Sequence, residues 1–185
     1  VVGRLKYFES KFERFFKIEP GDTVLDVGAC IGDTTIPMAI KTGSDGFIIA
    51  VEPHPVNIQC LKLNLKNFHN VEIVEKAVWN SSGVVRFNIH KTPTGHSILE
   101  DKERDRYMEV PCDTLDNIVG DRVVDFAKID VQGAEVTILK EGASKFLKNT
   151  RKLIVETHYR FSSKKRTYPE IIRILNDEGY ETRLT

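Results

Sequence analysis

The residues best suited to chemistry lie in the stretch Val24–Gly32, which reads VLDVGACIG. It is an apolar run that contains one acid, Asp26, and ends in two glycines, Gly28 and Gly32. Apolar residues followed directly by glycines indicate a buried strand that runs into a tight turn. A helix that begins just after the turn would bring its unpaired N–H groups to the same point. The stretch therefore predicts a binding site for an anionic or polar ligand group.

A second set of ionisable side chains follows the other apolar runs: Glu52, Asp130, and Glu156 with His158. In open α/β sheets, ligands bind beyond the carboxyl ends of the strands, so we expect this set to converge with Asp26 at one edge of a sheet. Glu52 comes about twenty residues after the glycine turn, where a carboxylate can accept hydrogen bonds from the hydroxyls of a ribose. These residues predict a nucleoside-containing ligand.

The glycine spacing separates two classes of such ligand. Dinucleotide-binding turns read G-x-G-x-x-G, which lets a pyrophosphate approach the backbone. Here Cys30 stands at the middle position, and no third glycine follows at the required distance. A carboxylate at Asp26 would repel a pyrophosphate but suits a cationic amino-acid head such as the ammonium of S-adenosylmethionine. We favour S-adenosylmethionine over NAD(P), and an oxidoreductase or a non-catalytic adenosylmethionine-binding module remain the alternatives.

The elements that must position these side chains alternate between strand and helix. Short apolar runs predict strands, and apolar residues at helical spacing follow most of them. This pattern is typical of an α/β fold, a doubly wound, mostly parallel sheet with helices on both faces. At 185 residues, we expect a single domain over residues 1–185. The expected strands are the run at Val24 and then Phe47–Val51, Val71–Val74, Val123–Ile129 and Leu153–Val155.

Two segments depart from this alternation. Residues 84–111 read as a small β insertion with a polar central stretch, and residues 1–20 predict an amphipathic helix packed on or capping the core. Thr167 and Glu170 have the spacing of a capping box before the last helix. Residues 180–184 are expected to form one further strand.

Composition restricts the partners. Lys and Arg number 27, as do Asp and Glu, so the formal net charge is zero and we expect no nucleic-acid partner. No apolar run reaches the roughly 18 residues that span a bilayer. Three cysteines without a close pair do not predict a disulfide framework, and no signal segment opens the chain, so we expect a cytoplasmic protein. The oligomeric state is left open.

Several motifs, in order, resemble a known family. VLDVGACIGDTT looks like motif I of the Rossmann-like (class I) methyltransferases, and VEPHPVN looks like their acidic second motif. The segment DFAKIDVQGAEVTILKEG, after CDTLDNIV and before KLIVETH, resembles the FkbM family of S-adenosylmethionine-dependent methyltransferases. The likeness runs from about Asp22 to His158. Gln132 departs from the family's more common D-V-E-G, which leaves the acceptor less defined.

The resemblance implies a Rossmann-like methyltransferase fold and S-adenosyl-L-methionine as cofactor, with S-adenosyl-L-homocysteine as product. It also implies methylation of a hydroxyl oxygen on a small molecule or sugar. Ala77 and Val78 are then expected to border the adenine. The residues expected to hold the cofactor are Asp26, Gly28, Ala29, Gly32, Glu52, Pro53 and Asp130.

Methyl transfer to a hydroxyl also requires the loss of a proton, for which a positioned base is useful. His158 has an ordinary pKa near neutrality, and Asp130 and Glu135 lie close to the same sheet edge, so these three are the catalytic candidates. The acids could also hold Mg²⁺. Because the sequence has no close carboxylate pair that demands a metal, we predict no metal site.

Overall fold

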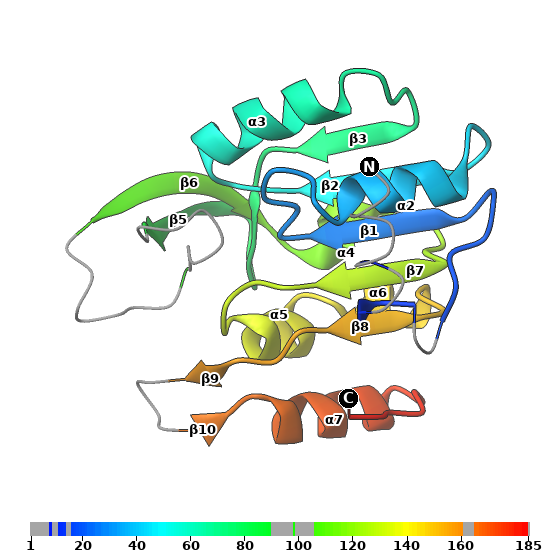
Figure 1. The fold of residues 1–185 in the computed structure, drawn as a ribbon. Helices are drawn as coiled ribbons and strands as arrows, with labels where there is room; N and C mark the ends of the chain where they lie inside the picture. The colour runs from blue at the N-terminus through cyan, green and yellow to red at the C-terminus, as the bar shows by residue number, and fades with distance from the viewer. Residues whose placement is uncertain are drawn as a thin grey trace.

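The computed structural model describes residue 8 and residues 11–13, 16–89, 98, 106–160 and 165–184. Its centre is a five-stranded parallel sheet in the order β3-β2-β1-β7-β8, flanked by helices (Figure 1). The predicted fold class is therefore confirmed. The strands are β1 (Thr23–Val27), β2 (Phe47–Val51), β3 (Val71–Val74), β7 (Phe126–Ile129) and β8 (Leu153–Val155).

The strand order creates one switch point. From β1 the chain builds outward through β2 to β3, and it later returns to the other side of β1 with β7 and then β8. The carboxyl ends of β1 and β7 therefore border the crevice where ligands bind in such sheets. In the register of these two strands, Asp26 is paired with Lys128.

Helices cover both faces of the sheet. Alternate residues of each strand point to opposite faces, so each face presents apolar side chains to the helices. On one face, Leu25 and Ile129 pack against residues of α4 to α7. On the other face, Val24 and Ile48 pack with residues of α2 and with Phe8, while Ala50 packs with residues of α2 and α3. The helices are α2 (Thr35–Thr42), α3 (Pro55–Leu65), α4 (Leu115–Val119), α5 (Glu135–Glu141), α6 (Ser144–Lys148) and α7 (Tyr168–Asp177).

The β insertion is present as a second, three-stranded sheet. Strands β5 (Gly83–Asn88) and β6 (Tyr107–Asp113) pair antiparallel and extend to one side of the molecule (Figure 1). Strand β4 (Ala77–Val78) pairs parallel with the end of β6 and so ties the hairpin to the main domain. The inner face of this sheet carries Phe87, whose ring is buried.

Two local predictions are wrong. Residues 180–184 form no strand. The Tyr180 hydroxyl lies within hydrogen-bond distance of two carbonyls, 2.6 Å from that of Leu147 and 2.7 Å from that of Thr150, whereas Leu184 is 63% exposed. The segment is therefore anchored through its first side chain and not through strand pairing. The capping box is also absent, because the Thr167 side chain makes no cap hydrogen bond.

Other features were not specified by the sequence. Helix α4 begins after Thr114, whose hydroxyl accepts from the Asn117 N–H at 3.1 Å. Helix α6 and the short antiparallel strands β9 (Tyr159–Arg160) and β10 (Lys165–Arg166) were not predicted. Of the expected N-terminal helix, Phe8 and Phe12 are buried against the sheet, and most of its other residues lie outside the described part. Within the described part, no helix is long and apolar enough to cross a membrane.

Candidate functional site

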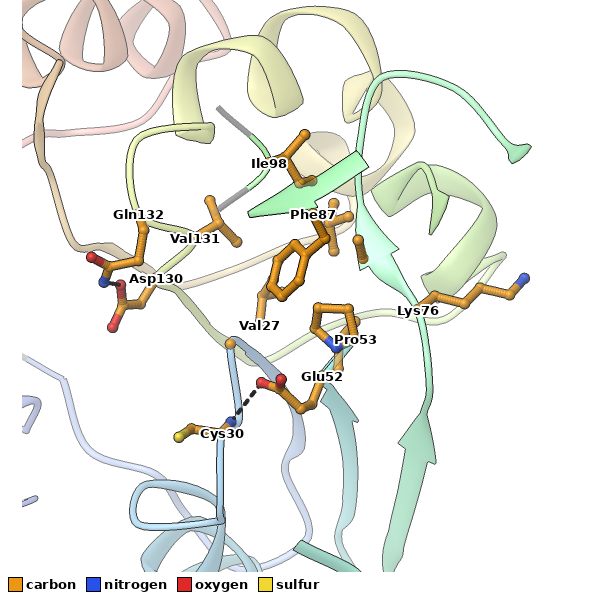
Figure 2. Close-up of a pocket in the computed structure, with 14 residues that line it drawn as sticks. Val27, Cys30, Glu52, Pro53, Lys76, Phe87, Ile98, Asp130, Val131 and Gln132 are labelled. Atoms are coloured by element: carbon orange, nitrogen blue, oxygen red, sulfur yellow. Dashed lines mark hydrogen bonds between the residues drawn. The ribbon is translucent and has the colours of Figure 1, made fainter. Parts of the chain in front are cut away.

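A cavity of about 80 Å³ lies at the carboxyl ends of β1, β2 and β7, next to the inner face of the β insertion (Figure 2). It brings together six of the predicted site residues from separate segments of the chain: Gly28, Glu52, Pro53, Ala77, Val78 and Asp130. Its other lining residues are Val27, Cys30, Val51, Lys76, Phe87, Ile98, Val131 and Gln132.

The first position of the glycine turn, Gly28, can be occupied only by glycine. Gly28 has a φ of +78°, and a Cβ there would lie 2.1 Å from the carbonyl oxygen of Asp130. Its N–H donates to the Val51 carbonyl at 3.0 Å. The backbones of β1, β2 and β7 therefore approach one another as closely as a residue without a side chain allows. Gly32, with a φ of +97°, plays a similar part against Leu61 of α3.

Three predicted cofactor residues, Asp26, Ala29 and Gly32, do not line the cavity. Ala29 is 1% exposed and packs in the core, and Gly32 faces α3. Asp26, which the sequence predicts to face a cationic ligand group, is completely buried. Its oxygens accept hydrogen bonds from the hydroxyls of Thr34 at 2.8 Å and Thr35 at 2.7 Å.

The other partner of Asp26 is Lys128, which sequence reasoning missed. The Lys128 ammonium lies 3.1 Å from the Asp26 carboxylate and donates to the Gly28 carbonyl at 3.2 Å. Burial alone would lower the pKa of Lys128, but the charges of Asp26 and Asp130 raise it, so the side chain stays protonated. The signal was a single lysine within a strand that is otherwise apolar. The ion pair of Asp26 and Lys128 therefore stabilises the glycine turn through the Gly28 carbonyl.

Glu52 occupies the end of β2 and is held by three donors. Its carboxylate accepts from the Cys30 N–H at 3.0 Å (Figure 2), from the His54 N–H at 2.9 Å and from the Asn57 amide at 3.2 Å. A carboxylate has about four lone-pair sites, so Glu52 keeps acceptor capacity beyond these bonds. Burial raises the pKa of Glu52. Burial, with the charge of Glu52, also raises the pKa of the Cys30 thiol to about 11, which leaves it unreactive at neutral pH.

The three predicted catalytic residues form one cluster beside the cavity. His158 Nδ1 lies 2.7 Å from Glu135 Oε1, and His158 Nε2 lies 3.5 Å from Asp130 Oδ1. Glu135 is completely buried, and the same Oε1 accepts from the Gly133 N–H at 2.9 Å. Gln132, with a φ of +56°, donates its side-chain amide to Asp130 at 2.8 Å. The imidazole is thus bracketed by two carboxylates.

The surroundings tune the protonation of this cluster. Burial alone would lower the pKa of His158, but the hydrogen bond and charge of Glu135, with the charges of Asp130 and Glu156, raise it. Burial raises the pKa of Asp130; Lys128 opposes this, and Glu156 adds to it. Glu156 itself pairs with Lys11 at 3.2 Å. Groups with shifted pKa values beside a cavity are typical of catalytic sites.

Comparison with known proteins decides the family. The model of the methyltransferase FkbM domain matches residues 26–182, which is most of the chain. This chain belongs to the FkbM methyltransferase family. The resemblance drawn from its motifs is therefore confirmed. Sequence comparison with curated proteins finds no match.

Solved structures agree on the fold of this FkbM-family chain. The methyltransferase FkbM from Methylobacillus flagellatus superposes with a TM-score of 0.67 at 15% identity, over 94% of this chain and 44% of that one. Aeropyrum pernix fibrillarin, in complex with natively bound S-adenosyl-L-methionine, gives 0.57 at 16% identity, over 98% and 66%. A Thermotoga maritima SAM-dependent O-methyltransferase gives 0.55 at 12% identity, over 95% and 49%. The chain thus spans less than half the length of the first of these structures.

The FkbM-family cavity also contains residues that the motifs did not indicate. Phe87 of β5 places its ring between Pro53 and Val131 (Figure 2), and Ile98 comes from the same insertion. The alternation within β5 could have shown that Phe87 faces inward, but not toward which element. Within the described ranges, no group of three or more His, Cys, Asp or Glu side chains is arranged to hold a metal ion.

Proposed function

We propose that this protein transfers the methyl group of S-adenosylmethionine to a hydroxyl oxygen of a small molecule or sugar. One observation carries the proposal. Asp130 lines the cavity at the switch point and also contacts His158, so a candidate base lies directly beside the expected cofactor site. Family membership supplies the methyl chemistry, and this cluster supplies the choice of a hydroxyl acceptor.

We place the cofactor along the cavity. Glu52 would accept from the ribose, Pro53, Ala77 and Val78 would border the adenine, and Gly28 and Asp130 would flank the methionine part. Asp26, Ala29 and Gly32 would act by shaping the turn. Ligand pockets usually measure about 300–1,000 Å³, so a cavity of about 80 Å³ has to widen when the cofactor binds. Phe87, whose ring lies between Pro53 and Val131, borders the space that would have to open.

S-adenosylmethionine supplies a methyl group on a positively charged sulfur and leaves as S-adenosylhomocysteine. When the acceptor hydroxyl takes up this methyl group, Nε2 of His158 would accept the hydroxyl proton. Nδ1 lies 2.7 Å from Glu135 Oε1; with the proton on Nδ1, this contact would fix the tautomer and stabilise the imidazolium that forms. Holding acceptor and methyl in line can supply much of the rate, and a positioned base adds about 10²- to 10⁴-fold.

Calorimetry with S-adenosylhomocysteine tests the cofactor. We expect saturable binding, and no heat at millimolar ligand with folded protein would reject the proposal. If NADH fluorescence changes on mixing instead, the result would favour the alternative of a nicotinamide-binding oxidoreductase. Binding of adenosylhomocysteine without transfer to any hydroxyl compound would favour a non-catalytic binding module.

Transfer of a labelled methyl group to a panel of sugars and small alcohols tests the reaction. We expect His158→Gln to lower the single-turnover rate about 10²- to 10⁴-fold while leaving adenosylhomocysteine affinity unchanged. An unchanged rate would remove His158 as the base. We also propose that no divalent metal takes part, so EDTA should not alter the rate. Loss of activity that Mg²⁺ restores would contradict this.

A further inference from the structure

Thr167 binds the backbone of His158 through three hydrogen bonds. Its hydroxyl accepts from the His158 N–H at 3.0 Å and donates to the His158 carbonyl at 3.0 Å. Its own N–H donates to the same carbonyl at 3.1 Å. Thr167 is 3% exposed, so these bonds are shielded from water. Both polar groups of the His158 backbone are therefore satisfied by one residue nine positions later.

The Thr167 side chain makes these bonds in place of a common one. A threonine at the start of a helix usually accepts from a backbone N–H of the first turn, which contributes about 0.5–2 kcal/mol. Thr167 immediately precedes α7 and makes no such bond. It instead joins the two ends of the excursion that carries β9 and β10. The hydroxyl thus stabilises the position of His158 and not the helix.

Two sets of contacts restrain His158: the hydrogen bonds from Thr167 to its backbone, here called the clamp, and the carboxylates around its ring. Thr167 fixes the backbone, while Glu135 fixes the ring at Nδ1, and Glu135 is itself held by the Gly133 N–H. We propose that Thr167 is a positioning residue that holds the imidazole of His158 against Glu135 and Asp130. The inference rests on the proposed role of His158 as the base. Because the imidazole has to lie within hydrogen-bond reach of the acceptor, a small backbone shift would slow proton transfer.

The charged groups around His158 make its position measurable. Glu135 of α5 and Asp130 after β7 face the ring, and Glu156 lies two residues earlier on the same segment. Thr167 carries no charge. If the backbone of His158 shifts, the imidazole moves away from the carboxylates that raise its pKa, and that pKa falls toward its ordinary value.

The test is an NMR titration of the histidine rings in wild type, Thr167→Val and Thr167→Ser. The chain has five histidines, so the His158 signal is identified by its absence in His158→Gln. Valine keeps the shape of threonine but removes the hydroxyl, and serine keeps the hydroxyl. We expect the pKa of His158 to fall in Thr167→Val and to stay near the wild-type value in Thr167→Ser. Equal pKa values in wild type and Thr167→Val would overturn the proposal.

Two further measurements cover the other outcomes. In wild type, the His158 amide should exchange with solvent slowly, because Thr167 accepts its hydrogen bond, and fast exchange would overturn the clamp even if Thr167→Val did not fold. Adenosylhomocysteine affinity should be the same in all three proteins. If wild type does not bind adenosylhomocysteine, the proposed function fails, while the titration still decides the role of Thr167.

Discussion

The two halves of the site are built in opposite ways. At the ends of β1 and β2, each charge is balanced or bound: Asp26 pairs with Lys128, and Glu52 accepts three hydrogen bonds. At the ends of β7 and β8, two carboxylates share one histidine. There, Glu135 Oε2 is buried with no hydrogen-bond partner among the described residues. The first half, at the ends of β1 and β2, is held rigidly by its own contacts. The second half, at the ends of β7 and β8, keeps polar groups that can exchange a proton.

This difference follows from what each half has to do in the proposed reaction. A cofactor site gains affinity when its groups are already in place, because little ordering is needed on binding. A proton acceptor instead needs a pKa that its surroundings shift, which a fully neutralised site would not provide. Variants should therefore affect stability and binding in the first half, and the protonation of His158 in the second.

The largest effect is expected from Lys128→Met, which leaves the Asp26 charge buried without its counterion. Removing one partner of a buried ion pair costs about 3–5 kcal/mol of unfolding free energy. Urea unfolding followed by circular dichroism measures it. In the double variant Asp26→Asn with Lys128→Met, both charges are gone, and we expect most of the loss to be recovered. A double variant as unstable as Lys128→Met would show that the pair does not act through charge.

Gly28→Ala should cost slightly less but should also abolish binding. The new Cβ would meet the Asp130 carbonyl, which costs about 1–3 kcal/mol for overpacking, and the left-handed backbone adds about 1–2 kcal/mol. Gly21 is the matched control, because it also has a positive φ of +89° but a Cβ added there would meet nothing within 4 Å. Thermal unfolding and adenosylhomocysteine calorimetry should show Gly21→Ala affected only by the backbone cost. If both variants lose the same stability, the close approach at Gly28 is unimportant.

Glu52→Gln should weaken adenosylhomocysteine binding and should also lower stability, because the NH₂ group of the glutamine cannot accept the Cys30 N–H that Oε2 of Glu52 accepts. The glutamine amide can replace only some of the charged hydrogen bonds, and each is worth about 1.5–3 kcal/mol. A loss of that size is about tenfold to about a hundredfold in affinity. Isothermal calorimetry measures it at constant pH, with circular dichroism to confirm folding. Unchanged affinity would remove Glu52 from the ribose.

Much of this arrangement was readable from the sequence, because the rules that place it are local or topological. Apolar runs ended by glycine or by an acid and proline predicted β1 and β2, and the rule that ligands bind at carboxyl strand ends grouped Glu52, Asp130 and His158. The partner of Asp26 could not be predicted from the sequence. It depends on the register between β1 and β7, which are neighbours in the sheet but far apart in the sequence, and this register sets Asp26 beside Lys128. Thr167 was misread for a related reason. A local capping pattern was outweighed by a contact with His158 that only the folded chain creates.

The smallest effect is expected for His158→Gln, whose loss of unfolding free energy should depend on pH, whereas that of Lys128→Met should not. The pKa of His158 is raised in the folded state, so its pairing contributes fully below about pH 6.5 and is lost as the pH rises through the folded-state pKa. The side chain is 22% exposed, so we expect about 1 kcal/mol or less. In urea unfolding, His158→Gln should therefore be less stable than wild type at low pH, with the gap closing at higher pH.

The exposed His69 provides the control, because His69→Gln should leave the unfolding free energy near wild type at both ends of the range. Lys128→Met should keep its deficit at every pH between these ends, since Lys128 stays protonated throughout. A His158→Gln deficit that is the same at low and high pH would mean that the imidazole acts by packing alone. The two halves of the site would then not differ in how their charges act, and the carboxylates of Glu135 and Asp130 would not tune the protonation of His158 for catalysis.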